Sequence, residues 1–190
     1  VLENGAKIAP PEQRWEHACP VCGEALLPAP TAETHPAAPL STSGTLVYAQ
    51  ERMAIRWALE RRIPLVALRF FELYGAETSG TAEKLVSRAV AGLPLEVGED
   101  GGQTRDYVHL ADVARAVALA LRAPCRDLLL LNVATSVQTS ALDFAACLER
   151  VLGKPLRVRA TGSFDRTEAR HLFARTEELA RLGYRPPMRL

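Results

Sequence analysis

The chain has 190 residues and a formal net charge of +1, with 48% hydrophobic and 24% charged residues. This is the composition of an ordinary globular protein of one domain, with or without a small appendage, and the near-neutral charge excludes a polyanion binder that relies on bulk charge. The sequence has no run of about 18 apolar residues, so it predicts no membrane-spanning helix.

The first 45 residues are predicted to form a loop-rich arm. Seven of the thirteen prolines lie between residues 10 and 39, and such a density prevents long helices and central strands. The arm contains one C-x-x-C-G turn, at Cys19 and Cys22. We therefore divide the chain into a proline-rich arm, residues 1–45, and a second part, residues 46–190, where regular elements are expected.

Helices and strands are predicted to alternate along the second part. Apolar spacing predicts helices over residues 46–62, 81–91, 111–123, 140–152 and 175–184, and short apolar runs predict strands over 63–70, 93–98, 107–110, 127–134 and 155–160. Ser41 to Ser43 are candidate caps for the first helix; Ser140 and Gly153 are expected to begin and end the fourth. Residues 99–106 read as a glycine-rich loop. This alternation favours an α/β fold with a largely parallel sheet.

A tyrosine and an arginine lie one turn apart in the first predicted helix. Tyr48 and Arg52 are four residues apart, and such side chains share one face of a helix. A tyrosine hydroxyl, with a pKa of about 10, is a poor base at neutral pH, but a cation held beside it favours the phenolate. A phenolate can take a proton from a sugar hydroxyl while a nicotinamide takes the hydride. The pair indicates either an acid/base site or an ordinary surface tyrosine.

Three further stretches narrow the choice: LRFFELYG at residues 68–75, GLPLEVGEDGGQTRDYVHLADVARAVALAL at 92–121 and LNVATSVQTS at 131–140. With the tyrosine helix, their order and spacing resemble the NAD-dependent epimerase/dehydratase family. These are extended short-chain dehydrogenases/reductases acting on nucleotide sugars, and the 4-epimerase-like members are the most similar. The resemblance covers about residues 40–185. It implies the second half of a Rossmann-like parallel sheet with a small α/β substrate-binding region, an NAD cofactor and a nucleotide-sugar substrate.

The resemblance also assigns roles to single residues. Tyr48 and Arg52 would be the catalytic pair and would contact NAD, Arg105 would bind the nucleotide diphosphate, and Tyr74, Glu72 and Arg170 would line the substrate site. Other roles are open for several of these positions. Arg105 could instead pair with Asp106 or Asp112, and Tyr74 could pack under the loop.

Neighbouring positions are expected to have structural roles. Asp112 is expected to cap the helix that follows it, and Arg69 to form a salt bridge with Glu72 or a nearby carboxylate. Asn132 is expected to end its strand by bonding backbone amides, and His109 to hold the loop.

The chain also departs from the family pattern. The G-x-x-G-x-x-G phosphate loop is absent from these 190 residues, so the sequence resembles the carboxyl-terminal portion of a longer enzyme and is expected to bind NAD poorly by itself. Arg52 stands where the family has lysine, and a planar guanidinium is not equivalent to an ammonium. Glu72 stands where the family has asparagine, and a carboxylate there would repel a phosphate.

The C-x-x-C-G turn is typical of a zinc knuckle, in which the backbone aims both thiolates at one ion. Four ligands are needed, and only Cys19 and Cys22 are clear, because His17 and His35 are irregularly placed. We therefore treat the two cysteines as candidate zinc ligands, with a reduced, metal-free turn as the alternative.

Two other function classes were weighed on the sequence alone, and only the first has support. Half of a sheet would expose a strand edge and apolar surface, which favours a homo-oligomer, or a non-catalytic domain that binds a partner. Nucleic-acid binding is not expected: residues 150–190 carry ten Lys/Arg against four Asp/Glu, but aromatic residues make up only 6% of the chain.

The cysteines show no disulfide framework and VLENGAKIAP is no secretory signal, which predicts a cytoplasmic location.

Overall fold

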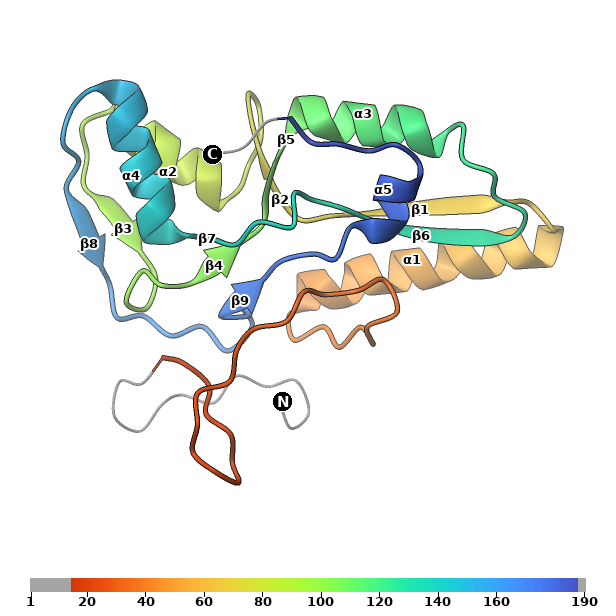
Figure 1. Ribbon diagram of the computed structural model, residues 1–190, viewed down its shortest axis with the longest axis horizontal. Coiled ribbons are helices and arrows are strands. Elements are labelled where there is room, and N and C mark those ends of the chain that lie inside the picture. Colours follow the sequence, from red (N-terminus) through yellow and green to blue (C-terminus); the bar gives the residue numbers. More distant parts are fainter. Residues whose placement is uncertain (1–14, 188–190) are drawn as a thin grey trace.

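The structure, a computed structural model, describes residues 15–187 and alternates helices with short strands (Figure 1). The elements are α1 (Thr42–Arg61), β1 (Leu65–Phe70), β2 (Glu72–Tyr74), α2 (Thr81–Val90), β3 (Leu95–Val97), β4 (Thr104–Arg105), β5 (Tyr107–His109), α3 (Leu110–Ala120), β6 (Leu128–Val133), β7 (Thr139–Ser140), α4 (Ala141–Leu152), β8 (Val158–Ala160), β9 (His171–Leu172) and α5 (Glu177–Arg181). Most of the pairings between these strands are parallel. The predicted α/β fold class is confirmed.

The longest strand pair lies between two helices. Strand β1 runs parallel to β6 with Arg69 opposite Asn132, and α1 and α3 lie on opposite sides of this pair (Figure 1). Ser41 begins α1 by accepting a hydrogen bond from the Gly44 N–H. The helix therefore starts at Thr42, before the predicted position 46 and inside the predicted arm, and the division of the chain at residue 45 stays a prediction.

A second group of elements forms a smaller lobe, which we call the α2/α4 lobe. Strand β2 pairs with β5 and β3 pairs with β8, all in parallel, while α2 contacts β2, β3 and α4. The predicted ends of α4 are confirmed. Ser140 forms a capping box with Asp143, and Gly153 ends the helix with a φ of 62°.

A short three-stranded sheet joins the two parts. Strand β4 pairs antiparallel with β7 and parallel with β9. The sequence analysis predicted a loop where β4 lies, and it predicted no separate strands at β2, β7 or β9. These strands are two or three residues long, which is too short for an alternating apolar pattern to be visible.

Two apolar clusters make up the core. One, in the α2/α4 lobe, includes Leu85, Leu95 and Phe144, and the other surrounds β6 between α3 and α5. Strand β5 connects them: Tyr107 is buried in the first cluster and Val108 in the second, because successive side chains of a strand point to opposite faces. No helix within residues 15–187 is long and apolar enough to cross a membrane.

The predicted cap of α3 is wrong. His109, not Asp112, is the N-cap residue, and its Nδ1 accepts a hydrogen bond from the Ala111 N–H at 3.1 Å. Asp112 lies within the first turn, where its buried carboxylate pairs with Arg115. A carboxylate in the first turn is still favoured by the helix dipole, which explains why the sequence pattern resembled a cap.

Candidate functional site

A pocket of about 260 Å³ lies where the carboxyl end of β1 meets β2, β4 and β9. The carboxyl ends of parallel strands are where ligands bind in open α/β sheets. The lining residues are Phe70, Phe71, Glu72, Arg105, Asp106 and Leu172. The structure thus brings together two predicted substrate residues, Glu72 and Arg105, that are 33 positions apart in the sequence.

The Arg105 side chain is held by two backbone oxygens and one carboxylate. Its guanidinium donates to the backbone oxygens of Thr104 and Arg170, at 2.9 and 3.4 Å, and pairs with Glu168 at 3.1 Å. The pairing with Asp106 or Asp112, left open as an alternative, is not the one observed, because the carboxylate partner is Glu168, 63 residues away. Glu168 is half exposed, and exposed ion pairs are weak. An anionic ligand can therefore compete for this guanidinium.

Asp106, the next residue, fixes the loops around the pocket. Its fully buried carboxylate accepts hydrogen bonds from the Thr135 N–H and hydroxyl, both at 2.7 Å, and from the N–H groups of Ser136 and Ala174. Burial raises the pKa of Asp106, although these hydrogen bonds act in the opposite direction. The carboxylate ties the ends of β6 and β9 to β4. The motif that contains Arg105 and Asp106 drew attention to this part of the chain, but it did not predict the groups that Asp106 binds.

Glu72 faces the start of helix α2. Its Oε1 accepts a hydrogen bond from the Thr81 N–H at 3.1 Å, and the N-cap residue Gly80 offers no side chain of its own for this purpose. Free N–H groups at a helix N-terminus favour an anion. The carboxylate of Glu72 therefore occupies a position where a bound anion would be stabilised.

Tyr74 ends strand β2, two residues after Glu72, and does not line the pocket. Its ring meets the His109 ring edge-on, with centroids 5.0 Å apart, and it contacts the apolar cluster of the α2/α4 lobe. Burial raises the pKa of Tyr74, helped by the nearby carboxylate of Asp112. His109 holds backbone as expected, through the cap of α3.

Arg170 is buried, with 3% of its surface exposed. Its guanidinium binds three carboxylates, those of Glu16, Glu99 and Asp100, at 2.6 to 3.1 Å. Burial disfavours its charge, yet the carboxylates prevail and raise the pKa of Arg170 above its usual range. The guanidinium is thus bound by the protein itself, and only the backbone oxygen of Arg170 meets the Arg105 side chain.

Tyr48 is exposed near the amino end of α1, and the more buried stripe of that helix begins one turn later, with Glu51, Ile55 and Ala58 at helical spacing. Tyr48 is 36% exposed, and no side-chain hydrogen bond or ion pair joins it or Arg52 to another described residue. Neither side chain lines the 260 Å³ pocket.

A partly buried ion pair between Glu51 and Arg69 attaches this stripe to β1. Arg69 donates two 2.7 Å hydrogen bonds to the Glu51 carboxylate and a third to the Glu33 backbone oxygen. The expected partner of Arg69, a carboxylate, is confirmed in kind, but it is Glu51 and not Glu72. The pairing lowers the pKa of Glu51 against the effect of burial.

Asn132 and Glu33 attach the arm to β6. The Asn132 side-chain amide donates to the backbone oxygens of Thr31 and Arg175, and its backbone N–H donates to the Glu33 carboxylate. As expected, the Asn132 side chain bonds backbone peptide groups at the end of its strand, and these groups accept through their carbonyl oxygens. The arm is thereby fixed beside the carboxyl end of β6.

The C-x-x-C turn is a tight hairpin. Ala18 bridges Ala25, the Gly23 N–H donates to the Cys19 oxygen, and Gly23 has a φ of 74°. Hydrogen bonds from the backbone of Cys22 and Val21, and then from the Cys22 side chain, lower the pKa of Cys19. Within residues 15–187, no group of three or more His, Cys, Asp or Glu side chains is placed to hold a metal ion. The described residues of one chain therefore do not support the expected zinc site.

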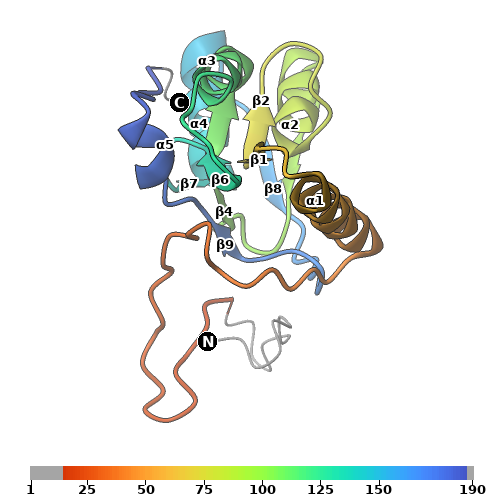
Figure 2. The ribbon, with the colours of Figure 1, turned by 90° about the vertical axis from the view of Figure 1, so that its right-hand side faces the viewer.

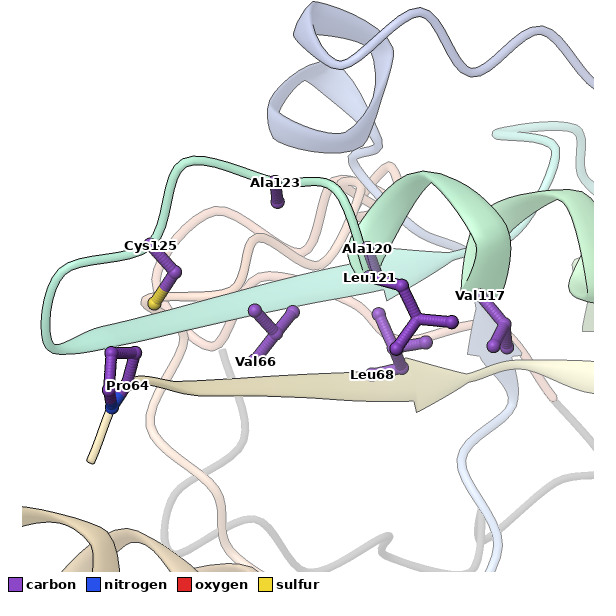
Figure 3. Close-up of a pocket in the computed structure, with 8 residues that line it drawn as sticks. All are labelled: Pro64, Val66, Leu68, Val117, Ala120, Leu121, Ala123 and Cys125. Atoms are coloured by element: carbon purple, nitrogen blue, oxygen red, sulfur yellow. The ribbon is translucent and has the colours of Figure 1, made fainter.

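A larger hollow, of about 450 Å³, lies away from these polar residues. Figure 3 shows it between β1 and α3, with Val66 and Leu68 on the strand and Cys125 on the loop before β6. Its lining side chains are apolar apart from the Cys125 thiol, so it offers no charged group for binding or catalysis. Cys125 is half-buried there, where a free thiol packs as a small hydrophobic group.

Comparison with protein families gives a match over residues 20–133 to the NAD dependent epimerase/dehydratase family. Among curated proteins, the chain is 32% identical over 173 residues to the dTDP-L-rhamnose 4-epimerase of Burkholderia thailandensis, covering 86% of this chain and 47% of that protein. It is 39% identical over 75 residues to a Streptomyces dTDP-4-dehydro-6-deoxy-D-allose reductase, covering 40% of this chain and 22% of that one. The chain spans about half the length, or less, of the curated relatives it matches.

Solved structures show the same similarity in three dimensions. The structure superimposes on UDP-glucuronic acid 4-epimerase from Bacillus cereus, solved in complex with UDP-glucuronic acid and NAD, with a TM-score of 0.78 and 25% identity. The match covers 86% of this chain and 53% of that one.

Proposed function

Because the chain belongs to the NAD-dependent epimerase/dehydratase family, we propose that it provides the substrate-binding part of an enzyme that epimerises or dehydrates a nucleotide sugar. The alternative of a non-catalytic partner-binding domain is not favoured by the family match. The relatives named above act on dTDP- and UDP-linked sugars, which supports a nucleoside diphosphate sugar as the proposed substrate class.

The observation that carries this proposal is the Arg105 guanidinium at the wall of the 260 Å³ pocket. A diphosphate would accept charge-assisted hydrogen bonds from it and replace the weak pairing with Glu168. Asp106 keeps Arg105 in place, because its four hydrogen bonds hold the loops on either side. The substrate would thus meet a cation whose position does not depend on flexible side chains alone.

NAD would accept a hydride from the sugar and return it. The described residues fit the sugar side of such a site better than the cofactor phosphates, since no G-x-x-G-x-x-G loop is present in the sequence. We propose Tyr48, at the amino end of α1, as the group that moves a proton at the sugar hydroxyl, with Arg52 as the neighbouring cation. The two would contact the nicotinamide side of the cofactor.

Glu72 is proposed to tune the strength of binding. Its carboxylate sits at the N-terminus of α2, where it would repel a diphosphate and compete with it for the Thr81 N–H. Tyr74, on the same strand as Glu72, would steady that strand through its ring contact with His109. Arg170 would support the pocket wall through the carboxylates of the 99–100 loop.

Calorimetric titration of the full 190-residue chain with UDP-glucose and dTDP-glucose tests the binding role. Arg105→Ala is expected to weaken binding at least about tenfold, which corresponds to about 1.4 kcal/mol. Arg56→Ala, which removes a guanidinium from an exposed pair on α1, is the matched control and should leave binding unchanged. Equal affinities for the Arg105 and Arg56 variants would refute the assignment.

The cofactor role is tested by titrating NAD into the same chain and following sugar conversion by NMR. We expect weak NAD binding and no turnover by the 190 residues alone. Micromolar NAD binding with turnover of a nucleotide sugar would contradict that expectation. In that event Tyr48→Phe should abolish turnover while leaving sugar binding intact; retained turnover would remove Tyr48 from the mechanism.

A further inference from the structure

The wall of the 260 Å³ pocket carries more negative than positive charge. It includes one guanidinium, that of Arg105, and two carboxylates, those of Glu72 and Asp106. Strands β4 and β9, which form part of this wall, lie side by side in both views (Figure 1 and Figure 2). The remaining lining residues are apolar: Phe70, Phe71 and Leu172. A ligand in this pocket therefore meets a single positive charge on its wall.

Two neighbouring guanidinium groups are already bound to carboxylates. Arg69, the residue before Phe70, donates two hydrogen bonds of 2.7 Å to Glu51. Arg170 is enclosed by three carboxylates, at 2.6 to 2.7 Å. Releasing either guanidinium to a ligand would leave partly or fully buried carboxylates without their partner, which is costly. Neither is therefore suited to bind a second anionic group of a ligand.

Glu72 is held in place by a backbone group and not by a cation. Its Oε1 accepts a hydrogen bond from the Thr81 N–H at 3.1 Å. Gly80 leaves the space for this contact, because a Cβ atom at that position would lie 3.0 Å from the same oxygen. Within residues 15–187, no ion pair is formed with Glu72. Its charge is offset only by the N-terminus of α2, so a further anionic group in the pocket would be repelled.

The charge of the sugar therefore matters for binding, and this step rests on the proposed function. A nucleotide sugar is charged on its diphosphate, which Arg105 would bind. A uronic acid adds a carboxylate on the sugar itself. That carboxylate would find no further cation on the pocket wall and would face Glu72, which lowers affinity. An uncharged sugar pays no such penalty, and its apolar faces suit the Phe70, Phe71 and Leu172 side chains.

We propose that Glu72 makes this site selective for nucleotide sugars whose sugar is uncharged, and against nucleotide-linked uronic acids. Membership in the family does not decide this point. One solved relative is a UDP-glucuronic acid 4-epimerase, whereas the two curated relatives reported above are named for dTDP-L-rhamnose and dTDP-4-dehydro-6-deoxy-D-allose. The deciding group is a side chain of this chain, at a position where the family pattern has asparagine.

Calorimetric titration of the full chain with UDP-glucose and UDP-glucuronic acid tests the proposal, because these ligands differ only at carbon 6 of the sugar. UDP-glucuronic acid is expected to bind about tenfold more weakly, and the difference should shrink as the salt concentration rises. Equal or tighter binding of UDP-glucuronic acid would overturn this inference and leave the proposed function in place, since UDP-glucose would still bind. Binding of neither ligand would refute both.

Two variants assign the selectivity to a residue. Glu72→Gln keeps the size of the side chain and an oxygen that accepts from the Thr81 N–H, but it removes the charge. The ratio of the two dissociation constants should then approach one, through tighter binding of UDP-glucuronic acid. Glu96→Gln removes an exposed carboxylate of β3 that does not line the pocket and should leave the ratio as in the wild type.

The ratio separates selectivity from a structural role of Glu72. A merely structural role would change both affinities alike and leave their ratio unaltered. A wild-type ratio in Glu72→Gln, or an equal change of the ratio in Glu96→Gln, would overturn the assignment to Glu72.

Discussion

The sequence predicted helix α1 as well as the two helices of the α2/α4 lobe. The lobe buries most of its large apolar side chains fully or in part, whereas α1 leaves most of its own exposed. In the lobe, Leu85, Leu95 and Phe144 come from three elements and are all buried together. In α1, twenty residues bury only Ile55 and Ala58. The exposed large hydrophobic residues of α1 are Leu46, Val47, Tyr48, Met53, Trp57 and Leu59.

This contrast shows that apolar spacing predicts a helix without predicting how much of its surface is covered. The lobe depends on close packing of apolar side chains, whereas α1 is joined to β1 by a narrow stripe and by the Glu51–Arg69 ion pair. The two regions should therefore respond to different perturbations. Substitution inside the lobe tests packing, and substitution along α1 tests a polar contact.

The largest effect is expected from Phe144→Ala. Phe144 is buried and stacks on Tyr107 with ring centroids 4.7 Å apart, so its removal leaves a cavity in the lobe. Urea unfolding should show a loss of about 3–5 kcal/mol in the free energy of unfolding. A loss as small as that of an exposed α1 residue would mean that the lobe is not closely packed.

A second large effect is expected at the boundary of the two regions, from Asp106→Asn. The substituted amide places an NH₂ group opposite backbone N–H donors, so at least one buried donor loses its partner. We expect a loss of about 1–3 kcal/mol in the free energy of unfolding. Asp143→Asn, whose carboxylate accepts hydrogen bonds from Ser140 in the exposed capping box of α4, is the control and should cost less; an equal or larger loss there would contradict the role of Asp106.

A smaller and pH-dependent effect is expected from Glu51→Gln. Gln keeps the size of Glu but loses the charge that Arg69 binds, and we expect a loss of about 1–2 kcal/mol at neutral pH. The pKa of Glu51 is lowered in the folded protein below its usual 4.5. The stabilisation is therefore complete above about pH 4.5 and is lost as the pH falls through the lowered pKa.

The measurement is thermal or urea unfolding of both proteins from pH 7 to pH 3. The difference between wild type and variant should shrink toward the acid end. Glu60→Gln, in the exposed Arg56–Glu60 pair, should change stability by less than about 0.5 kcal/mol at every pH. A Glu51 effect that stays constant with pH would show that the charge is not responsible.

The smallest effect on stability is expected from Met53→Ala. Met53 lies on the exposed side of α1, and surface substitutions away from packed positions usually change stability by less than about 0.5 kcal/mol. Urea unfolding at two protein concentrations measures it. A loss of 2 kcal/mol or more would show that this face of α1 is covered in solution, which would remove the contrast with the lobe.

Local sequence signals predicted the elements whose ends depend on neighbouring residues. The capping box of α4 joins residues three apart, and Gly153 ends that helix through its own backbone conformation. The strands β1 and β6 were visible because each begins with four consecutive apolar residues. The prediction that Asp112 caps α3 was wrong, because a carboxylate in the first turn of a helix and an N-cap residue look alike in the sequence.

The polar partners of the candidate site were not predictable in this way. Arg105 was identified from its motif, but its partner Glu168 lies 63 residues away, and Arg170 is bound by Glu16 from 154 residues away. A carboxylate and a guanidinium attract at any sequence separation. Nothing local in the chain therefore decides which of the many charged residues will meet.

The sequence by itself determined the family resemblance, the α/β alternation and the identities of Arg105, Glu72 and the two cysteines of the hairpin. Only the tertiary structure decided that Arg105 and Glu72 share a pocket, that Asp106 holds the surrounding loops, and that Arg170 is enclosed by carboxylates. The physical reason is that helix spacing and caps depend on residues within one or two turns. Burial and charge pairing depend instead on where distant segments of the chain come together.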